Sequence, residues 1–196
     1  MNKNSHKKGI SKYDLVSGFS LIEALVGLTI LSVGLIGILA LVSGSISNTL
    51  NARDKTVAIY LASEAIEIIK NKRDSNLLAE VQWDDGFGTE CNGVSCIADS
   101  NATLGVPIIS PCVGACTFDI YEVDYNSNKM YGHRDVWDLV PGATITLTNF
   151  TREITSGPTI PSSGNRLITA VVSWRTSGGD TQQVVVKEYI FDAGER

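Results

Sequence analysis

The sequence is poor in the groups on which most enzyme mechanisms depend. Of its two histidines, only His133 lies beyond the first 18 residues. No serine lies in a G-x-S-x-G nucleophile motif, and no glycine-rich phosphate-binding loop occurs. Because His133 stands alone beside Arg134 and Asp135, we expect it to be a surface residue. The sequence therefore predicts no enzymatic activity, no cofactor and no bound metal.

Basic residues are also scarce outside the N-terminus. The net charge of the chain is −5, and the first 18 residues, with four lysines and one aspartate, are positive. The rest of the chain therefore has a net charge of −8. Proteins that bind nucleic acids usually present clusters of Lys and Arg to the phosphates. We therefore expect no direct contact with nucleic acid.

Charge is missing from a long stretch near the N-terminus. Residues 24–42 are 19 consecutive uncharged residues, and with residues 19–22 they are long enough to cross a ~30 Å hydrocarbon core as a helix. The lysines before this stretch predict a cytoplasmic N-terminus and a C-terminal part outside the cytoplasmic membrane. Only a loose A-x-A pattern follows, so a cleaved secretory signal fits poorly. A plain signal anchor remains an alternative.

Helical periodicity continues beyond this stretch. Between Val57 and Ile69, apolar residues recur every three or four positions, while most charged residues lie on other faces. The pattern ends near KNKRDSN, residues 70–76. The sequence therefore predicts one helix over residues 19–75, with residues 19–43 as its membrane-spanning part.

The remainder of the chain changes from irregular to β-type patterns. Residues 76–116, which contain the cysteines, are rich in Gly, Asn and Asp and are predicted to be a connecting loop. Residues 117–196 are predicted to form an antiparallel β head, with residues 156–165 as an exposed loop between strands. An α+β fold follows, in which the sheet covers the apolar stripe of the helix.

The clearest hairpin in the head joins residues 166–174 to residues 183–192 through a glycine-containing turn at 178–180. In the first strand, alternate apolar residues from Ile168 to Trp174 share one face. In the second strand, the corresponding face is apolar except for Glu188. These two faces are expected to pack on the helix.

The four cysteines, Cys91, Cys96, Cys112 and Cys116, lie close together in the sequence. Two disulfides are the preferred interpretation, because disulfides persist outside the cytoplasm. A zinc site with four thiolate ligands and free thiols are the alternatives. The sequence leaves the disulfide connectivity open.

The N-terminal segment resembles that of a known family. The motif GFSLIE at residues 18–23, which follows a basic leader and precedes the apolar run, is similar to the prepilin signal of type IV pilins and pseudopilins. The resemblance implies that a prepilin peptidase removes the leader, residues 1–18, by cleaving between Gly18 and Phe19. It also implies N-methylation of Phe19 and a charge pair between its new ammonium group and Glu23. It further implies a lollipop fold, with a long helix under a β head, and residues 19–43 of that helix in the core of a filament.

The same resemblance implies a structural role. The chain would first reside in the cytoplasmic membrane as a single-pass protein. An assembly ATPase and a platform protein would then insert it into a helical filament of pilins at the cell surface. Residues 30–41 resemble minor pilins of the pilus-modification type. Major pilins usually carry a proline about twenty residues into the mature helix, and this chain has none between Gly18 and Val106. A minor pilin is therefore expected.

Two alternatives stay open. A type II secretion pseudopilin or a DNA-uptake pilin would show the same N-terminal motif. A membrane-anchored binding protein that never polymerises would keep residues 1–18 and would have no need of Glu23.

Overall fold

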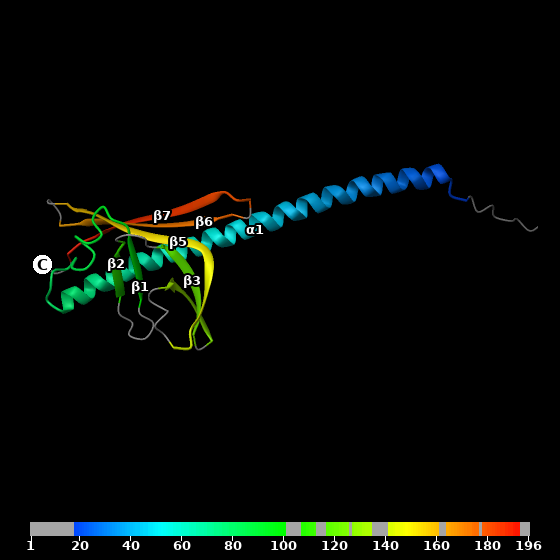
Figure 1. The fold of residues 1–196 in the computed structure, drawn as a ribbon. Helices are drawn as coiled ribbons and strands as arrows, with labels where there is room; N and C mark the ends of the chain where they lie inside the picture. Colours follow the sequence, from blue (N-terminus) through cyan, green and yellow to red (C-terminus); the bar gives the residue numbers. More distant parts are fainter. Residues whose placement is uncertain are drawn as a thin grey trace, which may run out of the picture. The chain divides into compact units, whose positions relative to one another are not determined.

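The computed structural model describes residues 18–100, 107–112, 117–125, 127–134, 141–160, 164–176 and 178–192. The chain divides into two compact units, Met1–Ile46 and Ser47–Arg196. One helix, α1 (Leu21–Leu78, 58 residues), begins in the first unit and ends in the second (Figure 1). In the second unit, an antiparallel sheet packs against α1. The predicted α+β fold class is therefore confirmed.

In the first unit, α1 is apolar and exposed. It is long and apolar enough to cross a membrane. Two of its hydroxyl groups bond within the helix: Thr29 Oγ1 donates to the Val26 carbonyl at 2.8 Å, and Ser32 Oγ donates to the Leu28 carbonyl at 2.7 Å. These bonds satisfy the hydroxyl groups without water, so they reduce the cost of placing them in lipid.

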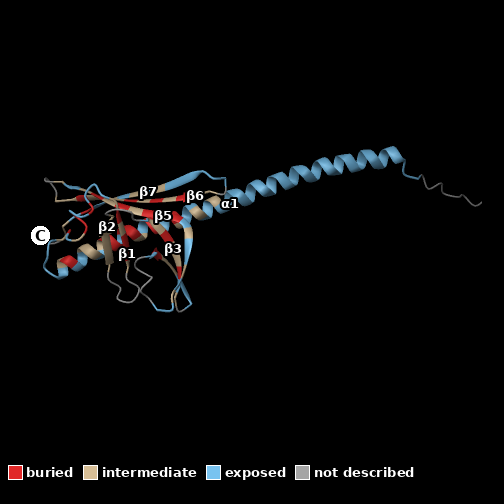
Figure 2. Ribbon diagram, viewed as in Figure 1, coloured by how far each residue is buried: buried red, intermediate tan, exposed pale blue. Residues whose placement is uncertain are grey.

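In the second unit, one face of α1 is buried against the sheet (Figure 2). The buried residues repeat every three or four positions, as the sequence predicts: Ala58, Leu61, Ala62, Ala65, Ile66, Ile68 and Ile69. The helix continues to Leu78, slightly beyond the predicted end. The side chain of Asn76 is buried and donates to the carbonyls of Trp83 and Asp85, which fixes the loop that follows the helix.

Seven strands form one sheet in the described part of the chain. Their bounds are β1 Cys96–Ser100, β2 Pro107–Pro111, β3 Asp119–Tyr125, β4 Asn128–His133, β5 Thr144–Thr159, β6 Arg166–Arg175 and β7 Thr181–Ile190. The order is β2-β1-β5-β3-β4, β6 also pairs with β5, and β7 pairs with β6. The long strand β5 is thus the centre of the sheet, because it pairs with β1, β3 and β6.

The predicted hairpin is present as β6 and β7, which pair in unbroken register from Arg166↔Ile190 to Arg175↔Thr181. Gly179 in the turn has φ +89°, a conformation that glycine adopts without strain. Alternate residues of β6 from Ile168 to Trp174 are buried on α1. Glu188, which interrupts the apolar face of β7, pairs with Lys70 of α1 at 2.8 Å.

Two predictions about the second unit are wrong in part, and a third, the exposure of His133, is wrong. The segment predicted as an irregular connector contains β1 and β2, which pair with each other in antiparallel register. Strand β5 extends to Thr159, so the predicted loop at 156–165 begins later than expected. His133 is buried, with 2% of its surface exposed, because it ends β4 where that strand passes close to β1.

Candidate functional site

The residues of the prepilin-like motif lie at the start of α1. Gly18 and Phe19 precede the helix, and Glu23 lies in its first turn. Phe19 is 79% exposed. An acidic side chain in the first turn is favourable, since the backbone N–H groups there carry partial positive charge. Phe19 lies four positions before Glu23 and outside the helix.

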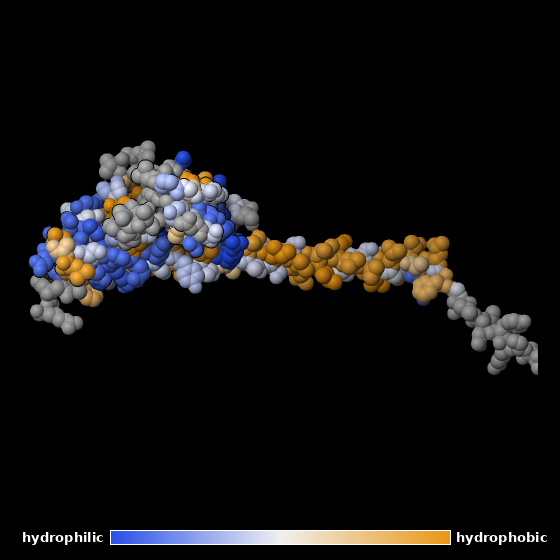
Figure 3. Space-filling model, turned by 90° about the horizontal axis from the view of Figure 1, so that it is seen from below, coloured by the Kyte–Doolittle hydropathy of each residue, from blue (hydrophilic) through white to orange (hydrophobic). Residues whose placement is uncertain are grey.

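Glu23 is followed by an uncharged stretch, residues 24–52, the first part of which is apolar on all sides. In Figure 3, apolar side chains cover this part of the helix on the face in view. All the large apolar side chains of the segment are exposed, among them Leu28, Ile30, Leu35, Ile38 and Leu41. Such a surface is typical of helices that contact lipid or another protein.

The glycines of this segment share one face of the helix. Gly27, Gly34, Gly37 and Gly44 are separated by seven, three and seven positions, the spacing of a helix-packing seam. Glu23, four positions before Gly27, lies on the same face. A Cβ at any of the four glycines would meet nothing within 4 Å, so the face is open. Small residues let two helix backbones approach closely in a membrane. The spacing of these glycines is the sequence signal that identifies this face.

In the second unit, Arg152 of β5 joins three elements of the fold. Its side chain is fully buried, and Nη1 donates to Glu64 Oε2 at 2.7 Å and to the Leu61 carbonyl at 3.2 Å, both in α1. Nη2 donates to the Ala98 carbonyl of β1 at 2.7 Å. A buried cation needs such partners, because desolvation without them is costly.

Asp99 and His133 form a second buried polar contact beside Arg152. The two carboxylate oxygens of Asp99 accept hydrogen bonds from the backbone N–H of Ser100 and from that of His133. Burial raises the pKa of Asp99 to about 6, although Arg152 and the two N–H donors oppose the increase. Burial lowers the pKa of His133 to about 3, and the Arg152 cation adds to the decrease. Both side chains are thus less readily charged than in water.

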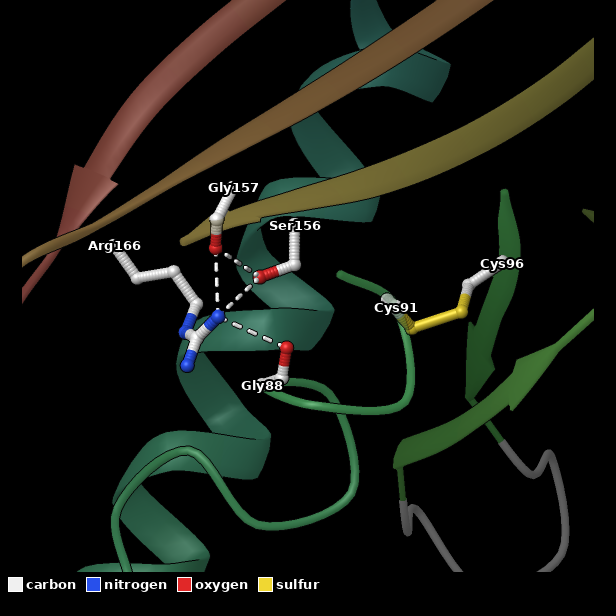
Figure 4. The surroundings of a disulfide bond; sticks show 6 residues. All are labelled: Gly88, Cys91, Cys96, Ser156, Gly157 and Arg166. Carbon is white, nitrogen blue, oxygen red and sulfur yellow. Dashed lines mark hydrogen bonds between the residues drawn. A yellow bond between two sulfur atoms is a disulfide. The ribbon is translucent and has the colours of Figure 1, made fainter. Parts of the chain in front are cut away.

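The cysteines stabilise the loop after α1. Cys91 and Cys96 form a disulfide, which links this loop to the start of β1 (Figure 4). Cys112 is also disulfide-bonded, whereas Cys116 lies outside the described residues. The zinc alternative is therefore wrong for Cys91, Cys96 and Cys112, since their thiolates are not available as ligands.

An ion pair stabilises the same loop. Arg166 of β6 pairs with Asp84 at 2.7 Å, and both side chains are almost completely buried. The Arg166 guanidinium also donates to the carbonyls of Gly88 and Gly157, as Figure 4 shows. Residues near 84–91 are thus held against the sheet by both covalent and ionic contacts.

The candidate site is therefore the N-terminal part of α1, with Gly18, Phe19 and Glu23 at its start. Within the described part of the chain, no three His, Cys, Asp or Glu side chains are placed to bind a metal. The buried side chains of Asp99, Arg152 and Arg166 bond to backbone groups, and the two arginines also pair with Glu64 and Asp84, as expected for groups that stabilise the fold. Comparison with known proteins found no match to a family model, to a curated protein or to a solved structure.

Proposed function

We propose that this chain is a structural subunit of a type IV pilus, and a minor pilin in particular. The observation that carries the proposal is Glu23, a single carboxylate at the start of a helix segment that is otherwise uncharged and fully exposed. A carboxylate near lipid is costly unless it has a partner. Cleavage after Gly18 would create that partner as the ammonium group of Phe19.

The same residues supply a mechanism of assembly. In the cytoplasmic membrane, residues 19–43 are surrounded by lipid, and the head lies outside. When an assembly ATPase and a platform protein lift the subunit, its helix exchanges lipid for the helices of other pilins. Little hydrophobic energy is gained in this exchange, so close packing and polar contacts decide the register. The glycine face permits the close packing, and the pair between Phe19 and Glu23 supplies the polar contact.

N-terminal processing tests the proposal directly. We expect protein recovered from its native cell to begin at Phe19 and to carry one added methyl group on that residue. Intact-mass measurement followed by N-terminal peptide sequencing reads both changes. A chain that still begins at Met1 in cells with an active prepilin peptidase would favour the alternative of a membrane-anchored protein that does not polymerise.

The role of Glu23 is tested by Glu23→Gln. This variant keeps the size of the side chain but removes its charge, so the Phe19 ammonium would enter the filament core unpaired, at a cost of about 3–5 kcal/mol. We expect at least a tenfold decrease in the amount of this chain in sheared filaments, measured by quantitative immunoblot, with cleavage after Gly18 retained. Glu90→Gln, at an exposed position of the second unit, is the control and should assemble normally. Normal incorporation of Glu23→Gln would contradict the charge-pair role.

A further inference from the structure

Strand β7 forms a free edge of the sheet (Figure 1). It pairs with β6 on one side, and no strand in the described part of the chain pairs with its other side. Because the backbone groups of a β-strand point alternately to its two sides, about half of the N–H and C=O groups of β7 point away from β6. Within the described residues, no protein group bonds to them. They are therefore available to an additional strand.

The other two edges of the described sheet, β2 and β4, are less open to an added strand. β2 is five residues long and has a proline at each end, Pro107 and Pro111, which lack an N–H group. β4 is six residues long, and the N–H group of His133 at its end is already bonded to the Asp99 carboxylate. β7 is ten residues long, contains neither proline nor glycine, and pairs with β6 without a bulge. Strand addition therefore favours the β7 edge.

The side chains along the β7 edge define the sequence of a partner strand. On the sheet face that is turned away from α1, β7 presents Val185, Lys187 and Tyr189 at alternate positions. Val185 is 45% exposed and Tyr189 is 54% exposed. Lys187 is also exposed, and it has no ion-pair partner among the described residues. A carboxylate directly opposite would pair with Lys187, and apolar side chains on either side of that carboxylate would cover Val185 and Tyr189.

On the other face of the sheet, α1 leaves an apolar side chain uncovered near the same edge. Ile59 is 43% exposed. It lies eleven positions, or about three helical turns, before Lys70. It therefore shares the α1 face from which Lys70 reaches Glu188 of β7 at 2.8 Å. A strand beside β7, at the usual distance of ~4.8 Å, would cover this face of the helix with its inward-pointing side chains.

Filament geometry favours a different protein over a second copy as the source of the strand. Two copies of β7 can pair with each other only across a twofold axis, because the same edge serves in both copies. In the proposed filament all copies point in one direction, so no twofold axis relates them. Pairing of β7 with β2 or β4 of a neighbouring copy is disfavoured, since those edges are less open.

We propose that the β7 edge binds an extended segment of a different protein as an additional strand of the sheet. The segment carries an acidic residue opposite Lys187 and an apolar residue two positions to either side of it. Backbone hydrogen bonds provide the affinity, while the ion pair and the apolar pairs select the sequence. The site itself goes beyond the proposed function, whereas the choice of another protein over a second copy rests on it.

Peptide binding to the full-length chain in detergent tests the proposal. The probe is a labelled nonapeptide with Glu at its centre, Val two positions to either side, and Thr or Asn elsewhere. The control peptide has Lys at its centre. We expect the Glu peptide to bind at least tenfold more tightly, measured by fluorescence anisotropy, and to protect about five further amides of residues 181–190 from hydrogen–deuterium exchange. Absence of binding, or protection only outside residues 181–190, would overturn the proposal.

Charge exchange identifies the contact. In Lys187→Glu the preference should reverse, so that the Lys peptide binds at least tenfold more tightly than the Glu peptide. The matched control is Lys129→Glu, because Lys129 is an exposed lysine on the edge strand β4, and this variant should keep the wild-type preference. Both positions are exposed, so folding should be retained. A reversal in Lys129→Glu, or none in Lys187→Glu, would show that β7 is not the binding edge.

The readouts also separate the site from its occupant and from the proposed function. If the purified chain forms dimers in which residues 181–190 are protected without any peptide, the assignment to another protein is wrong. If the chain keeps Met1 in its native cell but binds the Glu peptide as expected, the proposed function fails and the β7 site stands. If the chain is processed and assembled but binds neither peptide, the β7 site fails and the proposed function stands.

Discussion

Arg152→Met is expected to lower the free energy of unfolding of the second unit by about 3–5 kcal/mol at pH 7. The substitution keeps an apolar side chain of similar length but removes the cation that bridges α1, β1 and β5. The Ala98 carbonyl loses its charged donor, and the buried Asp99 carboxylate loses the nearby positive charge that favours its ionised form. Glu64 is partly exposed and can be hydrated, so the buried groups account for most of the loss.

Urea unfolding of the full chain in detergent, followed by the fluorescence of tryptophans such as the buried Trp174, measures this loss. Arg175→Met is the matched control, because Arg175 is an exposed arginine on the neighbouring strand β6. A surface change of this kind should alter stability by less than about 0.5 kcal/mol. If both variants lost less than about 1 kcal/mol, Arg152 would not be a central contact of the fold.

The parts of the fold that could be predicted from the sequence are those with a long local pattern. The apolar run and the periodic residues from Val57 to Ile69 specify α1, because a helix places every third or fourth residue on one face. The alternation in β6 and the glycines after it specify the β6–β7 hairpin in the same way. Gly18, Phe19 and Glu23 lie within six consecutive residues, so the sequence alone is enough to locate the candidate site.

The parts that could not be predicted depend on contacts between distant residues. Strand β1 is short and contains Asp99, a residue type that is rare in strands. Asp99 is tolerated there because its oxygens bind N–H groups of Ser100 and of His133, which is 34 positions away. The burial of His133 and the role of Arg152 follow from the same packing. No local sequence pattern indicates them, and the groove between α1 and β4 likewise exists only once β4 lies beside α1.

Asp99 and His133 should also make opposite contributions to the pH dependence of the free energy of unfolding. Between about pH 4 and pH 6, Asp99 is protonated in the folded state but ionised in the unfolded state, where its pKa is about 3.8. His133 is neutral in the folded state but protonated in the unfolded state, where its pKa is about 6.5. Folding therefore binds one proton at Asp99 and releases one at His133. The two effects cancel, so this pair contributes almost no slope to the stability of the wild-type protein in that range.

Each single variant should show a pH dependence of the free energy of unfolding that is cancelled in the wild-type protein. In Asp99→Asn only His133 remains, and since the unfolded state then binds the extra proton, stability should fall as the pH falls from 6 to 4, by about 1.4 kcal/mol per pH unit relative to wild type. In His133→Leu only Asp99 remains, and stability should rise by a similar amount over the same range. Urea unfolding at pH 4, 5 and 6 measures both slopes, and constant offsets from altered packing do not affect them. Parallel pH profiles for the two variants would show that Asp99 and His133 do not titrate as the buried geometry requires, because opposite shifts must give slopes of opposite sign.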